Sequence, residues 1–239
     1  MTTLKPLPPL QAVLLDVGGT LIDSEPSPPE VYAEVLGRWG RKIPVDRVTA
    51  AFRTTWMELT QLHPPGLDRY HLLKGGEREW WGEFVRRVMA TLEHPAPWQP
   101  VLEELFAAFA DPALWRVYPE VEEVLSALRR KGCRLAAVSN WDSRLPGILE
   151  GLSLARHFDA LLVSALEGVE KPSPVIFHRA AAQLGVEVGG CVHVGDSPLD
   201  DYRGAESAGM TSVLLDRHGL FADGYRRISD LRGLYALVN

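Results

Sequence analysis

Short apolar runs alternate with helical segments through the second half of this 239-residue chain, and this alternation restricts the possible folds most. Three of the four helical segments stop directly before a glycine, the residue that most often closes a helix. Buried strands separated by such helices are typical of a parallel sheet covered on both faces. We therefore expect a doubly wound, Rossmann-like α/β core. The expected strands are Ala12–Val17, Arg134–Ser139, Ala160–Val163, Val192–Val194 and Ser212–Leu215, and the helices Glu120–Lys131, Arg144–Leu152, Pro174–Leu184 and Leu199–Ala208.

More than a hundred residues separate the first expected strand from the second, and their apolar side chains recur every three or four residues. This spacing is typical of amphipathic helices. We expect an α-helical cap inserted after the first strand, so that residues 25–110 form the cap and residues 1–24 and 111–239 form the core. A cap placed over the strand ends could serve as a lid. Six tryptophans fall in or beside it; core packing is the favoured role for most of them, and lining of a substrate cleft is the alternative.

Composition excludes several classes of protein. The formal net charge is −6 and no long basic run occurs, which argues against nucleic-acid binding. Cys133 and Cys191 lie in no CxxC pair, so neither a disulfide framework nor a zinc site is expected. The start of the chain lacks the pattern of a secretory leader, and no apolar segment is long enough to span a bilayer. We expect a cytoplasmic protein without a membrane partner.

Two polar sequences lie at the ends of expected strands. Asp16 ends an apolar run and begins a glycine-rich turn, where a carboxylate could act as a nucleophile or simply form an Asx turn. Ser139 and Asn140 end the second expected strand, where they could bind phosphoryl oxygens or form an ordinary turn. Ligands of open α/β sheets collect at this end of the strands.

Two further sequences add charge at the same expected edge of the sheet. Lys171 stands just before the proline that starts a helix, and its ammonium could neutralise a carboxylate and a bound phosphate. A surface lysine is the alternative. Asp196, Asp200 and Asp201 follow the fourth expected strand, at a position where acids are favoured by the helix dipole and where they could also bind a divalent cation.

Taken together in this order, the four sequences resemble those of the haloacid dehalogenase superfamily of hydrolases. The resemblance runs from Leu10 to Leu215, with the helical insertion in the place of that family's helical C1 cap. The sequences Ser139–Leu145, Val194–Ser197 and Asp201–Gly204 look most like the subgroup known as hydrolase domain-containing protein 3. The resemblance implies a Mg²⁺-dependent phosphatase that acts on a small phosphorylated metabolite through an aspartyl-phosphate.

The resemblance also implies roles for the acidic residues. Asp16 would be the nucleophile and a Mg²⁺ ligand, and the backbone carbonyl of Gly18 would also bind the metal. Asp196 would coordinate Mg²⁺. Asp201, in preference to Asp200, would complete the metal site by supporting a metal-bound water.

Other residues are assigned to the phosphoryl group by the same resemblance. Ser139 and the backbone of Asn140 would hold it, and Lys171 would pair with it and with the nucleophile. Thr20 would brace the nucleophile loop, and Gly19 and Thr20 are counted with the substrate-binding residues.

Gly18 departs from the family pattern, because phosphatases of this family carry an aspartate there as general acid. Such assistance contributes about 10²–10⁴-fold in rate. Phosphates with activated leaving groups should suffer least from its loss, and a cap residue or Asp142 could supply the proton instead. A catalytically weak phospho-ligand-binding protein and a metal-free 2-haloacid dehalogenase remain as alternative functions.

Overall fold

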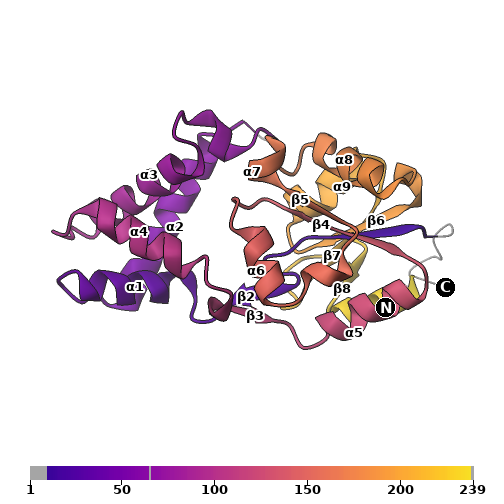
Figure 1. The fold of residues 1–239 in the computed structure, drawn as a ribbon, viewed down its shortest axis with the longest axis horizontal. Helices are drawn as coiled ribbons and strands as arrows, with labels where there is room; N and C mark the ends of the chain where they lie inside the picture. The colour runs from indigo at the N-terminus through magenta and orange to yellow at the C-terminus, as the bar shows by residue number, and fades with distance from the viewer. Residues whose placement is uncertain (1–9, 65, 238–239) are drawn as a thin grey trace.

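A computed structural model of the chain describes residues 10–64 and 66–237 and contains a six-stranded sheet beside a group of helices (Figure 1). All six strands are parallel, in the order β5-β4-β1-β6-β7-β8. The predicted doubly wound α/β core is confirmed. The strands are β1 (Ala12–Leu15), β4 (Arg134–Ser139), β5 (Ala160–Val163), β6 (Cys191–Gly195), β7 (Thr211–Leu215) and β8 (Arg227–Ile228).

Successive residues of β1 are buried on opposite faces of the sheet. Val13 and Leu15 belong to the apolar cluster under α5 (Val121–Arg130), α6 (Leu145–Gly151) and the 3-10 helix η6 (Leu231–Ala236). Ala12 and Leu14 belong to the cluster under α8 (Pro174–Leu184) and α9 (Gly204–Ser207). Helices therefore cover both faces, which explains why the strands read as continuous apolar runs.

Three details of the core differ from the sequence-based expectation. The first strand ends at Leu15 rather than Val17, because the chain turns at once into the loop that carries Asp16. The expected helix over Leu199–Ala208 is a π-helical segment, η5 (Pro198–Arg203), followed by α9. Strand β8 was not foreseen, because two residues are too few to give a periodic signal.

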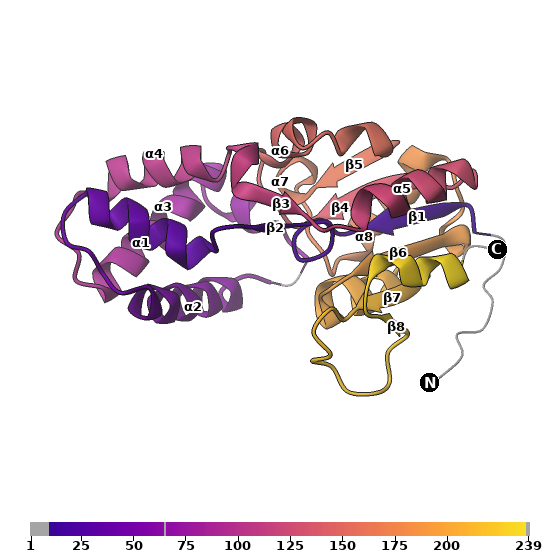
Figure 2. The same cartoon turned by 90° about the horizontal axis from the view of Figure 1, so that it is seen from below.

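Four α-helices form the helical insertion, which lies beside the sheet at the end to which the β1 arrow points (Figure 2). They are α1 (Pro28–Arg38), α2 (Val45–Gln61), α3 (Gly76–Thr91) and α4 (Trp98–Ala108), with the 3-10 helix η1 (Arg69–Leu72) between α2 and α3. Trp80 and Phe84 are fully buried at the centre of the group. No helix among residues 10–64 and 66–237 is both long and apolar enough to cross a membrane.

A two-stranded antiparallel ribbon joins the helical insertion to the core. Strand β2 (Ile22–Ser24) leads out of the core and pairs with β3 (Trp115–Val117), which leads back. Side-chain contacts between the two parts add to this connection. Arg69 pairs with Glu170, Glu77 accepts hydrogen bonds from Ser143, and α7 (Ser164–Glu167) packs near η1.

Candidate active site

The carboxyl ends of three neighbouring strands bring distant parts of the sequence together. Asp16 follows β1, Ser139 ends β4 and Asp196 follows β6. Because β1 pairs with β4 on one side and with β6 on the other, these side chains share one edge of the sheet. The Ser139 hydroxyl lies 3.4 Å from Asp16 Oδ1. This is the edge that faces the helical insertion (Figure 2).

Lys171 links two of the acids directly. Its Nζ lies 2.6 Å from Asp16 Oδ1 and 2.6 Å from Asp201 Oδ1, and all three side chains are buried. Charge-assisted hydrogen bonds of this kind are the strong ones. The structure thus brings the predicted nucleophile, the predicted lysine and Asp201 into contact, whereas Asp200 lies outside this group of contacts.

Asn140 fixes the backbone of Lys171 through its side chain. Its Oδ1 accepts a hydrogen bond of 2.7 Å from the Lys171 N–H, and its Nδ2 donates one of 2.9 Å to the Lys171 carbonyl. The sequence-based prediction gave Asn140 a backbone role and did not foresee this clamp. The loop that carries Lys171 is therefore tied to the end of β4.

His193 is a further site residue that the sequence analysis missed. It is fully buried on β6, and its Nε2 lies 2.8 Å from Asp201 Oδ1. The backbone N–H of Ser197 donates to the other oxygen of Asp201 at 3.0 Å. Because β6 is otherwise apolar, a histidine inside it is a signal that could have been used.

Burial and mutual repulsion set the ionisation of the acids. Burial raises the pKa of Asp16, and the positive charge of Lys171 opposes that shift. The Asp196 residue is exposed, yet partial desolvation of its carboxylate together with the charges of Asp16 and Asp201 raises its pKa to about 7. Burial would also raise the pKa of Asp201, but Lys171 and His193 outweigh it and hold that pKa below its usual range. Burial would lower the pKa of Lys171, yet the two aspartates beside it raise the pKa instead.

The acidic group has the composition of a site for a hard divalent cation. One carboxylate oxygen from each of Asp16, Asp196 and Asp201 lies within 4.8 Å of the other two. All three donors are oxygens, which suits Mg²⁺ better than a softer metal. The single positive charge of Lys171 balances only one of the three negative charges. A divalent cation would offset the repulsion between the carboxylates that remains. The residues present therefore fit the expected metal.

The loop after β1 holds the predicted residues Gly18, Gly19 and Thr20. Gly19 has φ +70°, and a Cβ there would lie 2.4 Å from Asp196 Oδ2, so both the backbone and the neighbouring carboxylate require glycine. Its N–H donates to the Ile22 carbonyl and its own carbonyl accepts from Arg217, so the Gly19 N–H is already used and does not face a substrate as a free donor. Thr20 is fully buried, and its hydroxyl has no hydrogen-bond partner in the described part of the chain.

Gly18 lies against the ring of Trp141, the residue after Asn140. A Cβ at position 18 would lie 3.2 Å from Trp141 Cζ3, which is closer than an ordinary van der Waals contact. The ring itself packs against Trp115 with a centroid distance of 4.8 Å. A side chain at position 18 would therefore require the indole to move by a few tenths of an ångström.

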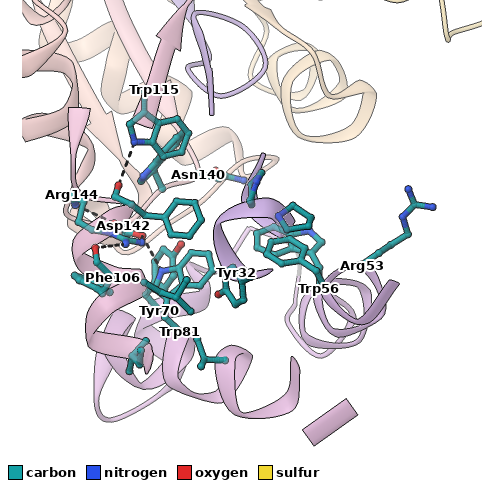
Figure 3. A pocket seen from close by; sticks show the side chains of 18 of the residues that line it. Tyr32, Arg53, Trp56, Tyr70, Trp81, Phe106, Trp115, Asn140, Asp142 and Arg144 are labelled. Carbon is teal, nitrogen blue, oxygen red and sulfur yellow. Dashed lines mark hydrogen bonds and ion pairs between the residues drawn. The ribbon is translucent and has the colours of Figure 1, made fainter. Parts of the chain in front are cut away.

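A cavity of about 530 Å³ lies between the helical insertion and the core (Figure 3). All four α-helices of the insertion and η1 contribute aromatic side chains to its wall, and the core contributes residues 140–142 and 144. The aromatic lining from the insertion is Tyr32, Phe52, Trp56, Tyr70, Trp81, Phe106 and Phe109. None of these aromatic residues could be assigned to the site from the sequence, because periodicity does not distinguish a packed ring from one that faces a cavity.

Asp142 was one expected source of a catalytic proton, and its contacts do not favour that role. Its two oxygens accept hydrogen bonds from Arg144 Nε at 2.8 Å and Nη2 at 2.5 Å. Trp81 Nε1 donates a third at 2.9 Å. A carboxylate that accepts from an arginine and an indole in this way is an anchor between core and insertion, and its oxygens are already engaged.

Comparison with known sequences gives the family. A sequence model of the haloacid dehalogenase-like hydrolases matches residues 10–209. The chain belongs to this family. Haloacid dehalogenase-like hydrolase domain-containing protein 3 of Mus musculus is 36% identical over 203 residues, which cover 84% of this chain and 79% of the relative. The phosphoserine phosphatase of Thermus thermophilus is 32% identical and aligns with 93% of this chain and 95% of its own.

Solved structures of haloacid dehalogenase-like proteins share the fold. A HAD phosphatase from Thermococcus onnurineus aligns with a TM-score of 0.65 at 27% identity, covering 94% of this chain and 96% of its own. The HAD-hydrolase YfnB of Bacillus subtilis, solved bound to magnesium, aligns with a TM-score of 0.77 at 18% identity over 96% of this chain and 99% of its own. The predicted resemblance to this superfamily is confirmed, and with it the assignment of the chain as a hydrolase.

Proposed function

We propose that this hydrolase is a Mg²⁺-dependent phosphatase that cleaves a small phosphorylated metabolite through an aspartyl-phosphate on Asp16. The observation that carries the proposal is the 2.6 Å contact between Lys171 Nζ and Asp16 Oδ1 beside Asp196 and Asp201. Two relatives with more than 30% identity carry the name of a phosphatase, one for phosphoserine and one for glyceraldehyde 3-phosphate. Those names support the reaction type and leave the substrate open. Residues 25–110 act as the cap in this proposal.

The reaction proceeds in two displacements. A carboxylate oxygen of Asp16 attacks phosphorus, the bond between phosphorus and the substrate oxygen breaks, and an acyl phosphate forms. Water then attacks the acyl phosphate, which releases inorganic phosphate and restores the carboxylate. No oxidant or reductant is needed in either step.

Three residues of the chain bind and orient the reacting groups. Lys171 holds Asp16 in place and supplies positive charge for the incoming phosphoryl oxygens. Asn140 keeps the Lys171 backbone in register with β4, and Ser139 offers a hydroxyl beside Asp16. Asp201 holds the other side of the lysine, and His193 and the Ser197 N–H fix Asp201 in turn.

Asp16, Asp196, Asp201 and the carbonyl of Gly18 would hold the Mg²⁺ ion. When bound, the ion supplies positive charge that reduces repulsion between the nucleophilic carboxylate and the anionic phosphoryl group. The all-oxygen donor set supports Mg²⁺ rather than a thiophilic metal.

The chain offers no acid at Gly18, so the departing oxygen takes its proton from solvent water. Substrates whose leaving group is a weak base therefore react best. We expect an aryl phosphate to be hydrolysed faster than a simple alkyl phosphate by at least the roughly 10²-fold that general-acid assistance is worth.

The test is hydrolysis of 4-nitrophenyl phosphate with Mg²⁺, with EDTA, and by the Asp16→Asn variant. Turnover that requires both Mg²⁺ and Asp16 supports the proposal. Asp16→Asn keeps the shape of the side chain and removes its nucleophilic charge, so it is a closely matched control. Equal rates for the wild type and this variant would exclude the aspartyl-phosphate mechanism.

A catalytically weak phospho-ligand-binding protein is the second candidate, favoured by the indole of Trp141 against Gly18. That candidate predicts tight binding of phosphate with Mg²⁺ and no turnover of 4-nitrophenyl phosphate. A metal-free 2-haloacid dehalogenase is disfavoured, because the uncompensated carboxylates would repel an anionic haloacid. Chloride release from 2-chloropropionate in EDTA would reverse that judgement.

A further inference from the structure

The cavity between the helical insertion and the core is largely apolar, although it lies beside a strongly charged site. Its charged wall residues are Arg53, Asp142 and Arg144. The last two neutralise each other in a buried ion pair. Arg53 is exposed and extends away from the other labelled side chains (Figure 3). The described residues therefore give the interior of the cavity an aromatic surface without an uncompensated charge.

Two tyrosine hydroxyls in the wall of this cavity have no partner. Tyr32 and Tyr70 are only 3% and 4% exposed. Across residues 10–64 and 66–237, neither hydroxyl makes a hydrogen bond. Neither oxygen is among the fully buried unpaired atoms, so both hydroxyls keep accessible surface in the cavity that these residues line. A polar atom on a bound ligand would supply the missing partner.

The cavity adjoins the nucleophile through residues that take part in both. Asn140 lines the cavity and also clamps the backbone of Lys171. Trp141 lines the cavity and also lies against Gly18, two residues after Asp16. A molecule with its phosphoryl group at Asp16 would thus continue past the indole into the aromatic space.

We propose that this cavity binds an aromatic group of the phosphorylated substrate, and that Tyr32 and Tyr70 bind a polar atom on that group. The inference deepens the proposed function and rests on it, since it assigns the substrate class of the same site. The volume of about 530 Å³ lies within the range of small-molecule sites. A sugar or an amino-acid zwitterion would lose more hydration in this wall than two hydroxyls could replace.

The first experiment compares two phosphate esters whose leaving alcohols have similar basicity, 2-phenylethyl phosphate and propyl phosphate. Burial of the phenyl ring should raise kcat/KM by roughly 10–150-fold over the propyl ester. Phosphoserine serves as the zwitterionic comparison and should react no faster than propyl phosphate. Equal kcat/KM for the phenyl and propyl esters would overturn the inference.

The second experiment measures binding alone, using phosphonates that cannot be hydrolysed. We expect 2-phenylethylphosphonate to bind more tightly than propylphosphonate in the presence of Mg²⁺. The Tyr32→Phe/Tyr70→Phe double variant should weaken 2-(4-hydroxyphenyl)ethylphosphonate by roughly 2–10-fold and leave the phenyl compound unchanged. Tyr235→Phe, which removes an exposed hydroxyl bonded to Glu123, is the matched control and should change neither.

These measurements separate the two proposals. If the phenyl phosphonate binds preferentially but no ester is hydrolysed, the aromatic site stands and the phosphatase function fails. If both esters are hydrolysed at equal kcat/KM, the function stands and the aromatic site fails. Unchanged binding of the hydroxyphenyl compound to the double variant would remove the tyrosines from the inference.

Discussion

Arg69 of the helical insertion and Glu170 of the core form a buried ion pair whose removal has a calculable effect. Arg69 Nε lies 2.8 Å from Glu170 Oε2, and Nη2 lies 3.2 Å from Oε1. The two side chains are 12% and 9% exposed. Arg69→Met keeps an unbranched apolar side chain and removes the guanidinium, whose Cζ also lies 5.4 Å from the ring centroid of Trp56 and 5.9 Å from that of Trp80.

The burial of this ion pair decides how much stability the protein should lose when the pair is removed. An exposed ion pair contributes about 0–1 kcal/mol, so its loss would hardly register. Removal of one partner of a buried pair costs about 3–5 kcal/mol, because the remaining charge is left without compensation. In Arg69→Met the Glu170 carboxylate keeps, among the described residues, only a 3.3 Å hydrogen bond from the backbone N–H of residue 69. We therefore expect the larger loss, a substantial part of the stability of a typical domain.

The assay is urea unfolding followed by far-UV circular dichroism. Arg69→Met should lose about 3–5 kcal/mol, and Arg69→Met/Glu170→Gln should recover part of that loss because no buried charge remains. Arg116→Met removes a pair with Glu25 whose side chains are 67% and 63% exposed, and it serves as the control. The reasoning fails if Arg69→Met is no less stable than Arg116→Met, or if the double variant is less stable than the single one.

Three further outcomes are expected. Gly18→Asp should raise the turnover of alkyl phosphates, and Gly18→Asp/Trp141→Leu should raise it further, because the Trp141 indole lies 3.2 Å from a Cβ at position 18. A lower rate in the double variant than in the single one would contradict this. Mg²⁺ at a hundred times its Kd should raise the free energy of unfolding by about 2.7 kcal/mol. Asp196→Asn should reduce this gain in stability. Because the pKa of Asp196 is about 7, the gain that Mg²⁺ gives the wild type should be smaller at pH 6 than at pH 8. A Mg²⁺-induced shift in the unfolding temperature that does not depend on pH would refute the assignment of Asp196 as a metal ligand. Burial raises the pKa of Glu83, but Arg87 and Arg86 outweigh burial and lower that pKa below 4.5. The ionised Glu83 side chain should therefore contribute about 0.3–0.5 kcal/mol to the free energy of unfolding above pH 4.5, and this contribution should be lost as the pH falls further. The difference in stability between the wild type and Glu83→Gln should shrink in the same way, which urea titrations from pH 7 to pH 4 can establish.

The core could be predicted from sequence because apolar runs alternate with helical segments and three of the runs lead directly into a polar residue. Apolar runs that stop at Asp16, Ser139 and Asp196 indicate both the strand and its functional end. Parallel pairing then requires those ends to meet at one edge. The same reasoning missed the Asn140 clamp on Lys171, because the pairing of a side chain with a distant backbone leaves no periodic signal.

The cavity lining could not be predicted, as two neighbouring tryptophans demonstrate. Trp80 is 1% exposed in the centre of the insertion, whereas Trp81 lines the cavity and donates to Asp142. Both residues are tryptophans on α3 and are neighbours in the sequence, so their sequence contexts are nearly the same. Only the direction of each ring around the helix axis differs, and the partners on other helices determine that direction.

The ribbon of β2 and β3 has a consequence for the modularity of the molecule. Ser24 and Trp115 are paired residues on adjacent strands, so the polypeptide leaves and re-enters the core at a single point. Excision of the intervening ninety residues would leave two ends that a short hairpin turn could join without moving either strand. The helical insertion is therefore a cassette that could be exchanged as a whole while the group of Asp16, Lys171 and Asp201 keeps its geometry.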